Sequence, residues 1–210
     1  MTIKHELQSI ISGNGSVRNG KIIQTITDYL RGKKKAGTEF EKEWNKDQET
    51  EVLIEYITDN NLWYSSLDES KYIDGGAEQK VYEFENLDFV VKVNDSIFYK
   101  SWHDYFINLL IHNFLFKRLA YELKGFIKYE NSLCAVVVQP FINATENTNL
   151  IAVKEFLEAN GFINKKNNDY FHPELGIIIE DLHDENVLTS EGVLQFIDTV
   201  IYLTDEFYAD

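Results

Sequence analysis

Three polar residues near the end of the chain have types and a spacing that suit the binding of a charged ligand. The stretch EDLHDENVL, at residues 180–188, contains Asp181 and, five positions later, Asn186. Asp198 follows Asn186 by 12 positions, inside the apolar run LQFIDTV. Asp and Asn also cap turns, and for each residue alone that role is an equally good explanation. Asp198 is harder to explain as a cap, because an unpaired carboxylate among apolar residues costs several kcal/mol.

These residue types fit the transfer of a phosphoryl group. A carboxylate and an amide oxygen that converge on one point form the hard, oxygen-rich site that Mg²⁺ prefers, which assigns Asn186 and Asp198 to a metal ion. Asp181 would then accept the proton of an incoming hydroxyl group. Phosphoryl transfer depends mainly on positioning and charge neutralisation, so it also needs a lysine and a backbone cradle for the phosphates.

Segments earlier in the chain supply those remaining parts in the expected order. Residues 75–82, GGAEQKVY, predict a glycine turn that enters a strand. The next predicted strand, FVVKV, carries Lys92. The segment VVVQPFI, at residues 136–142, would be the strand and connection where an adenine base bonds to the backbone.

The pattern of apolar residues predicts the elements that position these groups, and their order predicts an α+β fold. The charged region 1–70 reads as helical, with apolar faces in residues 21–31 and 48–64. Alternating β-branched and aromatic residues then predict a hairpin with a turn at residues 85–88. A long buried helix is predicted at 102–123, followed by two strands that a turn at 130–131 joins, the second ended by Pro140. A helix at 152–162, stopped by Gly161, comes next. A polar loop and two short strands, at 176–179 and 194–200, complete the prediction.

Composition narrows the classes of partner. The chain has 210 residues, a net charge of −15 and a sequence pI of about 4.7, and such an acidic surface repels nucleic acids and anionic lipids. No apolar run is long enough to cross a membrane, and the N-terminus lacks the apolar segment of a signal peptide. The single cysteine, Cys134, cannot form an internal disulfide bond. These features favour a cytoplasmic protein that binds neither nucleic acid nor membrane.

Residues 73–203 resemble a protein-kinase-like domain, and more narrowly the kinase domains of polyvalent proteins encoded on bacterial mobile elements. The segments that carry the resemblance are GGAEQKVY, VVKVND, HNFLF, VVVQPFINATE, NNDYFHPELGIIIEDLHDENVL and FIDTV. The DLHDEN motif is also similar to the catalytic loop of aminoglycoside-phosphotransferase-like kinases. The resemblance implies ATP and Mg²⁺ as ligands. It implies a phosphate-binding lysine at Lys92, a catalytic base at Asp181 with the basic residue His183 beside it, metal ligands at Asn186 and Asp198, and further nucleotide contacts at Gly75, Gly76, Val81, Gln139 and Phe141.

The resemblance divides the chain into three parts. Residues 1–70 form a helical N-terminal extension, residues 71–142 a small antiparallel lobe with the hinge, and residues 143–210 a shortened C-terminal lobe with the catalytic and metal-binding loops. The sequence ends 12 residues after Asp198, whereas protein kinases continue with an activation segment and several helices. We expect the N-terminal helices or a partner chain to replace part of that structure, unless substrate recognition has been lost.

Several positions depart from the kinase pattern. Asp74 and Gln79 stand where two of the three loop glycines would be, and Ile179 stands where a histidine is usual. A glutamate from the helix after the lysine strand normally pairs with the lysine. The candidates for that partner here are Asp104, early in the predicted helix, and Glu78, in the glycine turn.

Three functions remain open from the sequence. The first is an ATP- and Mg²⁺-dependent phosphotransferase that acts on an unknown protein or small molecule. The second is a nucleotide-binding or protein-interaction module without catalysis, which the departures from the kinase pattern favour. The third is a metal-dependent hydrolase that uses Asp181, His183 and Asp198. The third leaves the glycine turn and Lys92 without a role.

Overall fold

The chain folds as an α+β protein that is built from helices and antiparallel sheets. The computed structural model describes residues 2–36, 45–76, 79–84 and 88–209. A first sheet contains β1 (Tyr72–Gly75), β2 (Gln79–Glu83), β3 (Phe89–Asn94), β4 (Glu122–Tyr129) and β5 (Ser132–Pro140). Its strand order is β1-β2-β3-β5-β4, with every neighbouring pair antiparallel. The predicted turn at 85–88 lies outside the described residues, except for Asp88.

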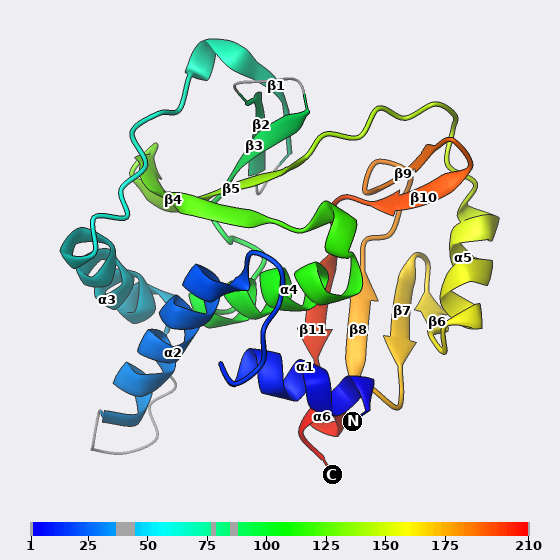
Figure 1. Ribbon diagram of the computed structural model, residues 1–210, viewed down its shortest axis with the longest axis horizontal. Helices are drawn as coiled ribbons and strands as arrows, with labels where there is room; N and C mark the ends of the chain where they lie inside the picture. Colours follow the sequence, from blue (N-terminus) through cyan, green and yellow to red (C-terminus); the bar gives the residue numbers. More distant parts are fainter. Residues whose placement is uncertain (1, 37–44, 77–78, 85–87, 210) are drawn as a thin grey trace.

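Helices precede this sheet, as the sequence predicts for residues 1–70. They are α1 (Ile3–Ile11), α2 (Gly20–Ala36) and α3 (Lys46–Asp59), followed by a short 3₁₀ turn (Glu69–Lys71). Asn45 and Gln48 form a capping box that fixes the start of α3. The apolar face of α2, with Ile23, Ile26 and Leu30, is fully buried in a core that α4 (Trp102–Leu115) shares. Figure 1 shows α1 and α2 packed along α4, on its side away from β3 and β5.

The predicted helix at residues 102–123 is too long, because α4 ends at Leu115. A 3₁₀ turn (Lys117–Leu119) follows, and β4 begins at Glu122. The reason is a tertiary contact: the buried Asn113 amide accepts from the backbone N–H of Tyr121 and donates to the backbone carbonyl of the same residue. This pair of bonds replaces the next helical turn and directs the chain into the sheet.

The β4–β5 hairpin confirms the predicted pair of strands and their turn. Glu130 and Asn131 both have positive φ, as a two-residue turn between antiparallel strands requires, and Tyr129 pairs with Ser132. Strand β5 ends at Pro140 as predicted. Because β5 lies between β3 and β4, its apolar residues 133–138 are buried on both faces.

The second half of the chain forms a separate small sheet and a hairpin. Helix α5 (Leu150–Ala159) is followed by its C-cap, Asn160, and then by Gly161 with φ of 86°, which confirms the predicted glycine stop. A sheet with the strand order β11-β8-β7-β6 comes next, and β9 pairs with β10. These strands are β6 (Ile163–Lys166), β7 (Asp169–His172), β8 (Ile177–Glu180), β9 (Val187–Ser190), β10 (Val193–Phe196) and β11 (Val200–Leu203).

Two predictions for this half are corrected. The polar stretch after Gly161 is the β6–β7 hairpin rather than only a loop, because Asn167 adopts a positive φ and turns the chain. The predicted strand at 194–200 is two strands, β10 and β11, which belong to different sheets. Asp198 therefore lies in the connection between them and not inside a strand, with 20% of its side chain exposed.

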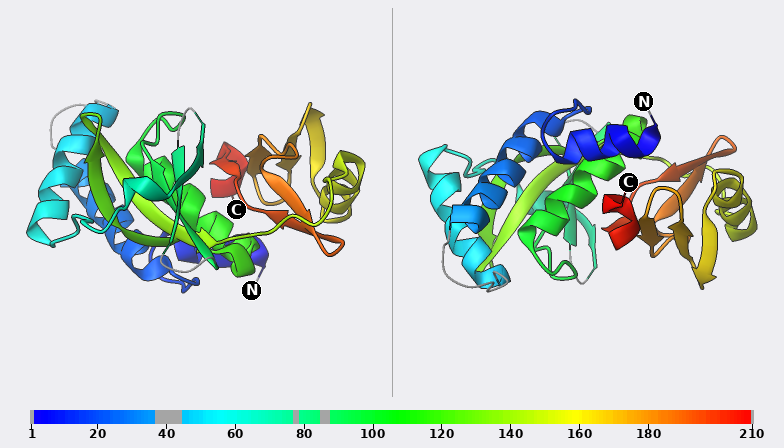
Figure 2. Two further views of the ribbon diagram at one scale, coloured as in Figure 1. Left: turned by 90° about the horizontal axis from the view of Figure 1, so that it is seen from above. Right: turned by 90° about the horizontal axis from the view of Figure 1, so that it is seen from below.

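Helix α1 joins the N-terminal region to the end of the chain. Leu7 and Ile11 are buried in the core that holds Ile177 of β8 and Phe207 of the short helix α6 (Asp205–Tyr208). Gln8 Nε2 donates to the Phe207 carbonyl at 2.8 Å. The two views in Figure 2 show α6, in red, at the junction between the second sheet and the rest of the molecule.

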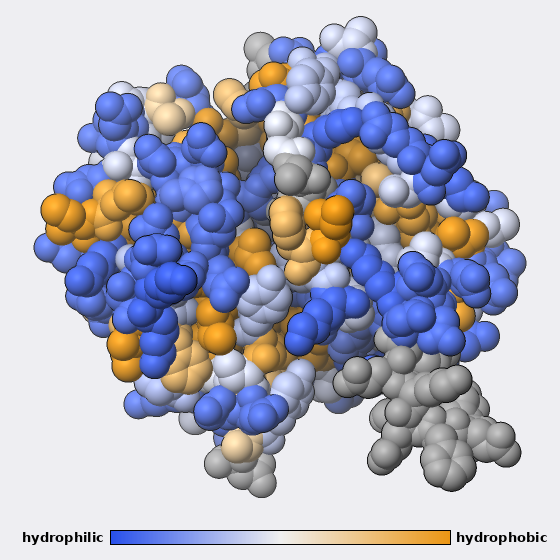
Figure 3. Space-filling view, turned by 180° about the vertical axis from the view of Figure 1, so that it is seen from behind, coloured by the Kyte–Doolittle hydropathy of each residue, from blue (hydrophilic) through white to orange (hydrophobic). Residues whose placement is uncertain are grey.

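The surface agrees with the acidic composition. Figure 3 shows hydrophilic side chains over most of one face, with apolar side chains in small separate groups. Among the described residues, no helix is long and apolar enough to cross a membrane.

Candidate functional site

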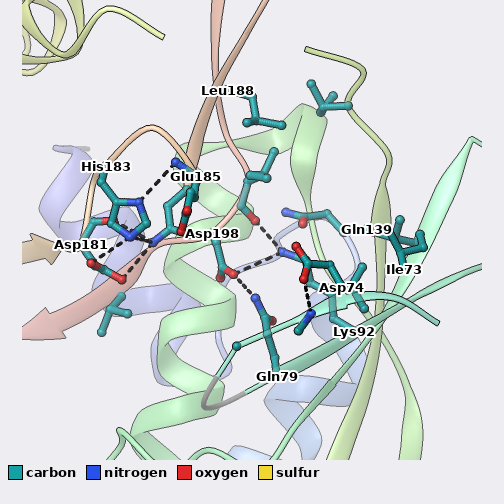
Figure 4. A pocket seen from close by; sticks show the side chains of 18 of the residues that line it. Ile73, Asp74, Gln79, Lys92, Gln139, Asp181, His183, Glu185, Leu188 and Asp198 are labelled. Carbon is teal, nitrogen blue, oxygen red and sulfur yellow. Dashed lines mark hydrogen bonds and ion pairs between the residues drawn. The ribbon is translucent and has the colours of Figure 1, made fainter. Parts of the chain in front are cut away.

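A cleft of about 890 Å³ lies between the first sheet and the loops of the second half. Its walls come from β1, β2 and β3, from the chain after β5, and from the segments that follow β8 and β10. Figure 4 shows Gln79, Lys92 and Asp198 facing one another, with Asp181 and His183 on the far side of Asp198. Every residue that the sequence assigns to the site lines this cleft: Gly75, Gly76, Val81, Lys92, Gln139, Phe141, Asp181, His183, Asn186 and Asp198.

The glycine turn forms one edge of the cleft. The Gly76 N–H donates to the Gln79 carbonyl at 2.9 Å, which joins the end of β1 to the start of β2. A Cβ atom added to Gly76 would meet nothing within 4 Å, whereas one on Gly75 would lie 2.9 Å from the Tyr72 hydroxyl. Gly76 therefore leaves open space for a ligand, and Gly75 allows the close approach of Tyr72.

Lys92 lies at the bottom of the cleft, in the middle of β3. It pairs with Val81 of β2 on one side and Val137 of β5 on the other, so its backbone is held in the sheet centre. Its side chain is 5% exposed, and Nζ donates to the Ile197 carbonyl at 3.0 Å. Nζ also lies 3.6 Å from Asp198 Oδ2, which makes a largely desolvated ion pair.

Asp198 is surrounded by hydrogen-bond donors. Gln79 Nε2 donates to its Oδ2 atom, and the Tyr121 hydroxyl lies 3.4 Å from its Oδ1 atom. Together with the Lys92 ammonium group, these contacts compensate the burial of the carboxylate. The sequence expectation that Asp198 needs a cation or several donors is met by both.

The two residues that the sequence assigns to a metal are joined through the backbone. The Asn186 carbonyl accepts from the N–H groups of Ile197 and Asp198, at 3.0 and 3.2 Å. The hairpin β9–β10, with Val187 paired to Phe196, brings these two segments together. Asn186 and Asp198 are thus neighbours although 12 positions separate them in the sequence.

Asp181 and His183 form the outer rim of the same loop. Asp181 has φ of 64°, an uncommon conformation for this residue type, and its N–H donates to Asp169 Oδ1 at 3.2 Å. Asn186 Nδ2 donates to Asp181 Oδ2 at 2.9 Å, and His183 Nε2 lies 3.2 Å from Oδ1. His183 Nδ1 accepts from the Glu185 N–H, so the neutral ring carries its hydrogen on Nε2 and donates to Asp181. Both contacts orient the Asp181 carboxylate.

Among the described residues, Asp198 and not the sequence candidate Asp104 forms the ion pair with Lys92. Asp104 lies in the first turn of α4, where its N–H donates to Ser101 Oγ. Its negative charge lies near Glu49 and contributes to raising the pKa of that carboxyl group. Glu78 lies outside the described residues. The helix instead presents His112, two turns later, near Lys92. Burial and the nearby Lys92 charge lower the pKa of His112 to about 3, so this imidazole is neutral and Asp198 supplies the negative charge.

The chain after β5 is the expected position for an adenine base. The Gln139 side chain is buried and donates to the Leu119 carbonyl at 2.9 Å, so it braces the wall of the cleft. The Phe141 N–H donates to the Asp88 carbonyl at 2.9 Å, and the Phe141 ring is 48% exposed in the cleft. Phe141 therefore offers its ring rather than its amide to a ligand.

The cleft is strongly acidic. Burial, and then the neighbouring Asp169 and Asp181, raise the pKa of Glu180. Lys92 and His183 are the basic side chains among the described residues of the wall. An anionic ligand can enter such a cleft only with cations that offset this charge. The carboxylates of the wall are Asp74, Asp169, Glu180, Asp181, Glu185 and Asp198.

Sequence reasoning does not assign some residues of the site. Asp169 and Tyr121 have no pattern that marks them, and His112 reads as an ordinary packed residue. Gln79 has a signal, because it stands at a position where the kinase pattern has glycine. Its contact with Asp198 spans 119 positions and depends on the fold.

A lysine in the middle of a central strand, an Asp-His-Asn loop and a second Asp beside it define the kinase-like class of domain. A family model for serine/threonine/tyrosine kinases found in polyvalent proteins matches residues 46–205. The chain belongs to this family, which confirms the resemblance seen in the sequence. Helices α1 and α2 lie outside the matched residues. No curated protein and no solved structure matches the chain. The similarity of the DLHDEN loop to aminoglycoside phosphotransferases stays a prediction.

Proposed function

We propose that this domain transfers the γ-phosphoryl group of ATP, in a Mg²⁺-dependent reaction, to a hydroxyl group of a protein or small molecule. The observation that carries the proposal is the hydrogen bond from the Asp198 N–H to the Asn186 carbonyl, which places the two residues side by side. The Lys92 ammonium group faces the Asp198 carboxylate. This set gives one cleft a metal site and a cation for phosphates. Membership of a kinase family supports the same reaction class.

The residues present fit a bound Mg²⁺ ion. Mg²⁺ in nucleotide sites takes one or two protein oxygens and completes its octahedron with water and phosphate. Asp198 offers a carboxylate, and Asn186 offers an amide oxygen while its Nδ2 group is bonded to Asp181. A bound Mg²⁺ would neutralise the phosphates and hold them in line for transfer. The excess of carboxylates in the wall makes such a cation a requirement for nucleotide binding.

The other residues take roles that follow from their places. Lys92 would turn from Ile197 and Asp198 to the phosphates, as a compact cation at the bottom of the cleft. Gly75 and Gly76 would cover the phosphates from the β1–β2 turn. The adenine base would lie beside Val81 and Phe141, which are apolar residues of the cleft wall.

Asp181 would act as the general base. It lies on the rim, 58% exposed, where a substrate hydroxyl can reach it. Asn186 and His183 fix the carboxylate so that one oxygen faces the incoming group. In this arrangement the first sheet, residues 71–142, forms the nucleotide lobe, and residues 143–210 form a shortened lobe that carries the catalytic loop.

A second candidate is nucleotide binding without transfer. The contact between Gln79 and Asp198 favours it, because that amide occupies an oxygen that the metal would need. The metal-dependent hydrolase has less support: the described residues contain no group of three His, Cys, Asp or Glu side chains arranged to hold a metal ion.

Calorimetric titration of ATP with and without Mg²⁺ tests the proposal. We expect binding to require Mg²⁺ in the wild type and to weaken at least about tenfold in Asp198→Asn, which removes a charged metal ligand. Asp184→Asn is the matched control, because Asp184 is an exposed carboxylate of the same loop outside the cleft wall. Equal Mg²⁺ dependence in wild type and Asp198→Asn would contradict the metal site. Phosphate transfer that survives in Asp181→Ala would contradict the role of the base.

A further inference from the structure

The segment 197–201, which carries Asp198, is bonded to α4 and to the residues just after it at several points. We propose that His112, Tyr121 and Asn108 are positioning residues that hold this segment at a fixed depth and so place the Asp198 carboxylate for metal binding. The inference rests on the proposed function, in which Asp198 is a metal ligand. The contacts are made by residues before and after Asp198 in the sequence. They therefore fix the segment both along its own direction and relative to the cleft.

The contact between His112 and Thr199 is the centre of this arrangement. His112 is fully buried, and its Nδ1 atom lies 2.9 Å from the hydroxyl of Thr199, the residue next to Asp198. Its Nε2 atom lies 3.2 Å from the Leu119 carbonyl, which can only accept. The hydrogen of the neutral ring is therefore on Nε2, and Nδ1 accepts from the Thr199 hydroxyl. Thr199 is itself buried, so no water competes for this bond.

Tyr121 and Asn108 hold the two ends of the segment. The Tyr121 hydroxyl donates to the Ile197 carbonyl at 2.9 Å, on the N-terminal side of Asp198. Asn108, on the same helix as His112, accepts from the Ile201 N–H at 2.9 Å through its buried amide oxygen. These bonds join residues 76 and 93 positions apart, so only the packed fold can form them.

Helix α4 is a rigid support for these contacts. Most of its residues are buried, and it packs against α1, α2, α3 and the strand β11. A carboxylate that is already held where the metal binds loses little freedom on binding, and outer contacts of this kind are worth about 10- to 100-fold in metal affinity. In this chain the neutral His112 of α4 accepts a hydrogen bond from Thr199, the residue next to Asp198. Among the described residues, no acidic side chain of α4 forms an ion pair with Lys92.

Two pairs of variants separate positioning from general packing. Thr199→Val removes the hydroxyl at nearly constant size, and Thr199→Ser keeps it. The side chain in His112→Gln places no acceptor at the position of Nδ1. The amide oxygen in His112→Asn lies at that position and can accept from the Thr199 hydroxyl. We expect Thr199→Val and His112→Gln to raise the Mg²⁺ concentration needed for ATP binding by about tenfold, and the conservative partners to restore it. At saturating Mg²⁺ the affinity for ATP should be the same in all four.

Hydrogen exchange of the nucleotide-free protein provides an independent measurement. We expect the Ile201 amide to exchange faster in Thr199→Val than in the wild type, with Thr199→Ser close to the wild type, while the exchange of β3 and β5 is unchanged. Unchanged exchange at Ile201 in Thr199→Val would overturn the inference even if ATP binds. Absence of Mg-ATP binding by the wild type would overturn the proposed function instead, and Ile201 exchange would still decide whether the segment is held.

Discussion

Asp198 is the residue on which the candidate site depends. Gln79 donates to its Oδ2 atom and the Lys92 ammonium group lies 3.6 Å from the same atom, so protein groups already compensate the charge of the carboxylate. In the proposed function, a metal ion at Asp198 would compete with the Gln79 amide, which shares the Oδ2 atom with Lys92. The affinity for Mg²⁺ would then depend on how easily Gln79 releases this contact.

Substitution of Gln79 tests that dependence. In Gln79→Ala the donor is absent, and we expect Mg²⁺ to support ATP binding at a concentration about three- to tenfold lower, which corresponds to the loss of one competing hydrogen bond to a charged group. Gln195→Ala is the control, because Gln195 lies on β10 outside the cleft wall. Calorimetric titration over a series of Mg²⁺ concentrations measures the effect. A higher Mg²⁺ requirement in Gln79→Ala would mean that Gln79 holds the carboxylate for the metal.

His112 makes stability depend on pH. Its pKa is lowered to about 3 in the folded protein from 6.5, mainly by burial, so the unfolded chain binds a proton that the folded chain does not. This contribution to stability is present above pH 6.5 and is lost as the pH falls. We expect the loss of this contribution to lower the free energy of unfolding by about 2 kcal/mol between pH 7 and pH 5. Urea unfolding at both pH values measures it.

The comparison with His112→Asn isolates this contribution. Burial raises the pKa of Glu49 and of Glu180, and these carboxyl groups act in the opposite direction as the pH falls. The wild type should lose about 2 kcal/mol more than His112→Asn over the same interval. An equal loss in the two proteins would show that His112 titrates normally in the folded state.

At the scale of elements, the end of α4 determines how the two sheets meet. The helix stops where Asn113 takes both backbone groups of Tyr121, and the chain then turns so that Tyr121 reaches the Asp198 segment. Without that stop, the apolar run at residues 114–123 would continue as helix, which is what its composition predicts.

Asn113→Ala tests the importance of this stop. The substitution leaves the buried N–H and carbonyl of Tyr121 without their partner, and we expect a loss of about 3 kcal/mol in the free energy of unfolding. Asn160→Ala is the control, because Asn160 caps the exposed end of α5, and it should cost about 1 kcal/mol or less. Denaturant unfolding compares the two. Equal losses would indicate that the end of α4 is fixed by its apolar packing alone.

At the scale of the whole molecule, α1 packs against the region that the family model matches. It lies outside residues 46–205, yet Leu7 is fully buried among side chains of α4, α5 and the strands of the second sheet. Lys4 Nζ also donates to the Ala209 carbonyl, near the C-terminal end of the described chain. Helix α1 thus contributes to the core of the second half.

Truncation of Leu7 measures this contribution. We expect Leu7→Ala to lower the free energy of unfolding by about 3 kcal/mol, because it opens a cavity in a packed core. Ile3→Ala on the same helix is the control: Ile3 is 55% exposed, and its loss should cost about 0.5 kcal/mol or less. Thermal unfolding with two probes, one in each half, would show whether both halves respond together. A change in one half alone would contradict the connecting role of α1.

The sequence by itself determined the kinds of groups and the local elements. The spacing of apolar residues and the types of residue in turns predict α2, α3, the β4–β5 hairpin and the stop at Gly161, because these features depend on residues a few positions apart. The motif residues Lys92, Asp181, Asn186 and Asp198 are identifiable for the same reason, because their order and spacing lie in the chain itself.

Only the tertiary structure decided which groups meet. The division of residues 194–200 between two sheets depends on pairing with different strands, and the contacts of Gln79 and His112 with the Asp198 segment join residues far apart in sequence. Gln79 and Asp198 are 119 positions apart, and His112 and Thr199 are 87 apart. Such contacts exist only when packing makes up for the entropy of closing those long segments, and local patterns contain no record of that balance.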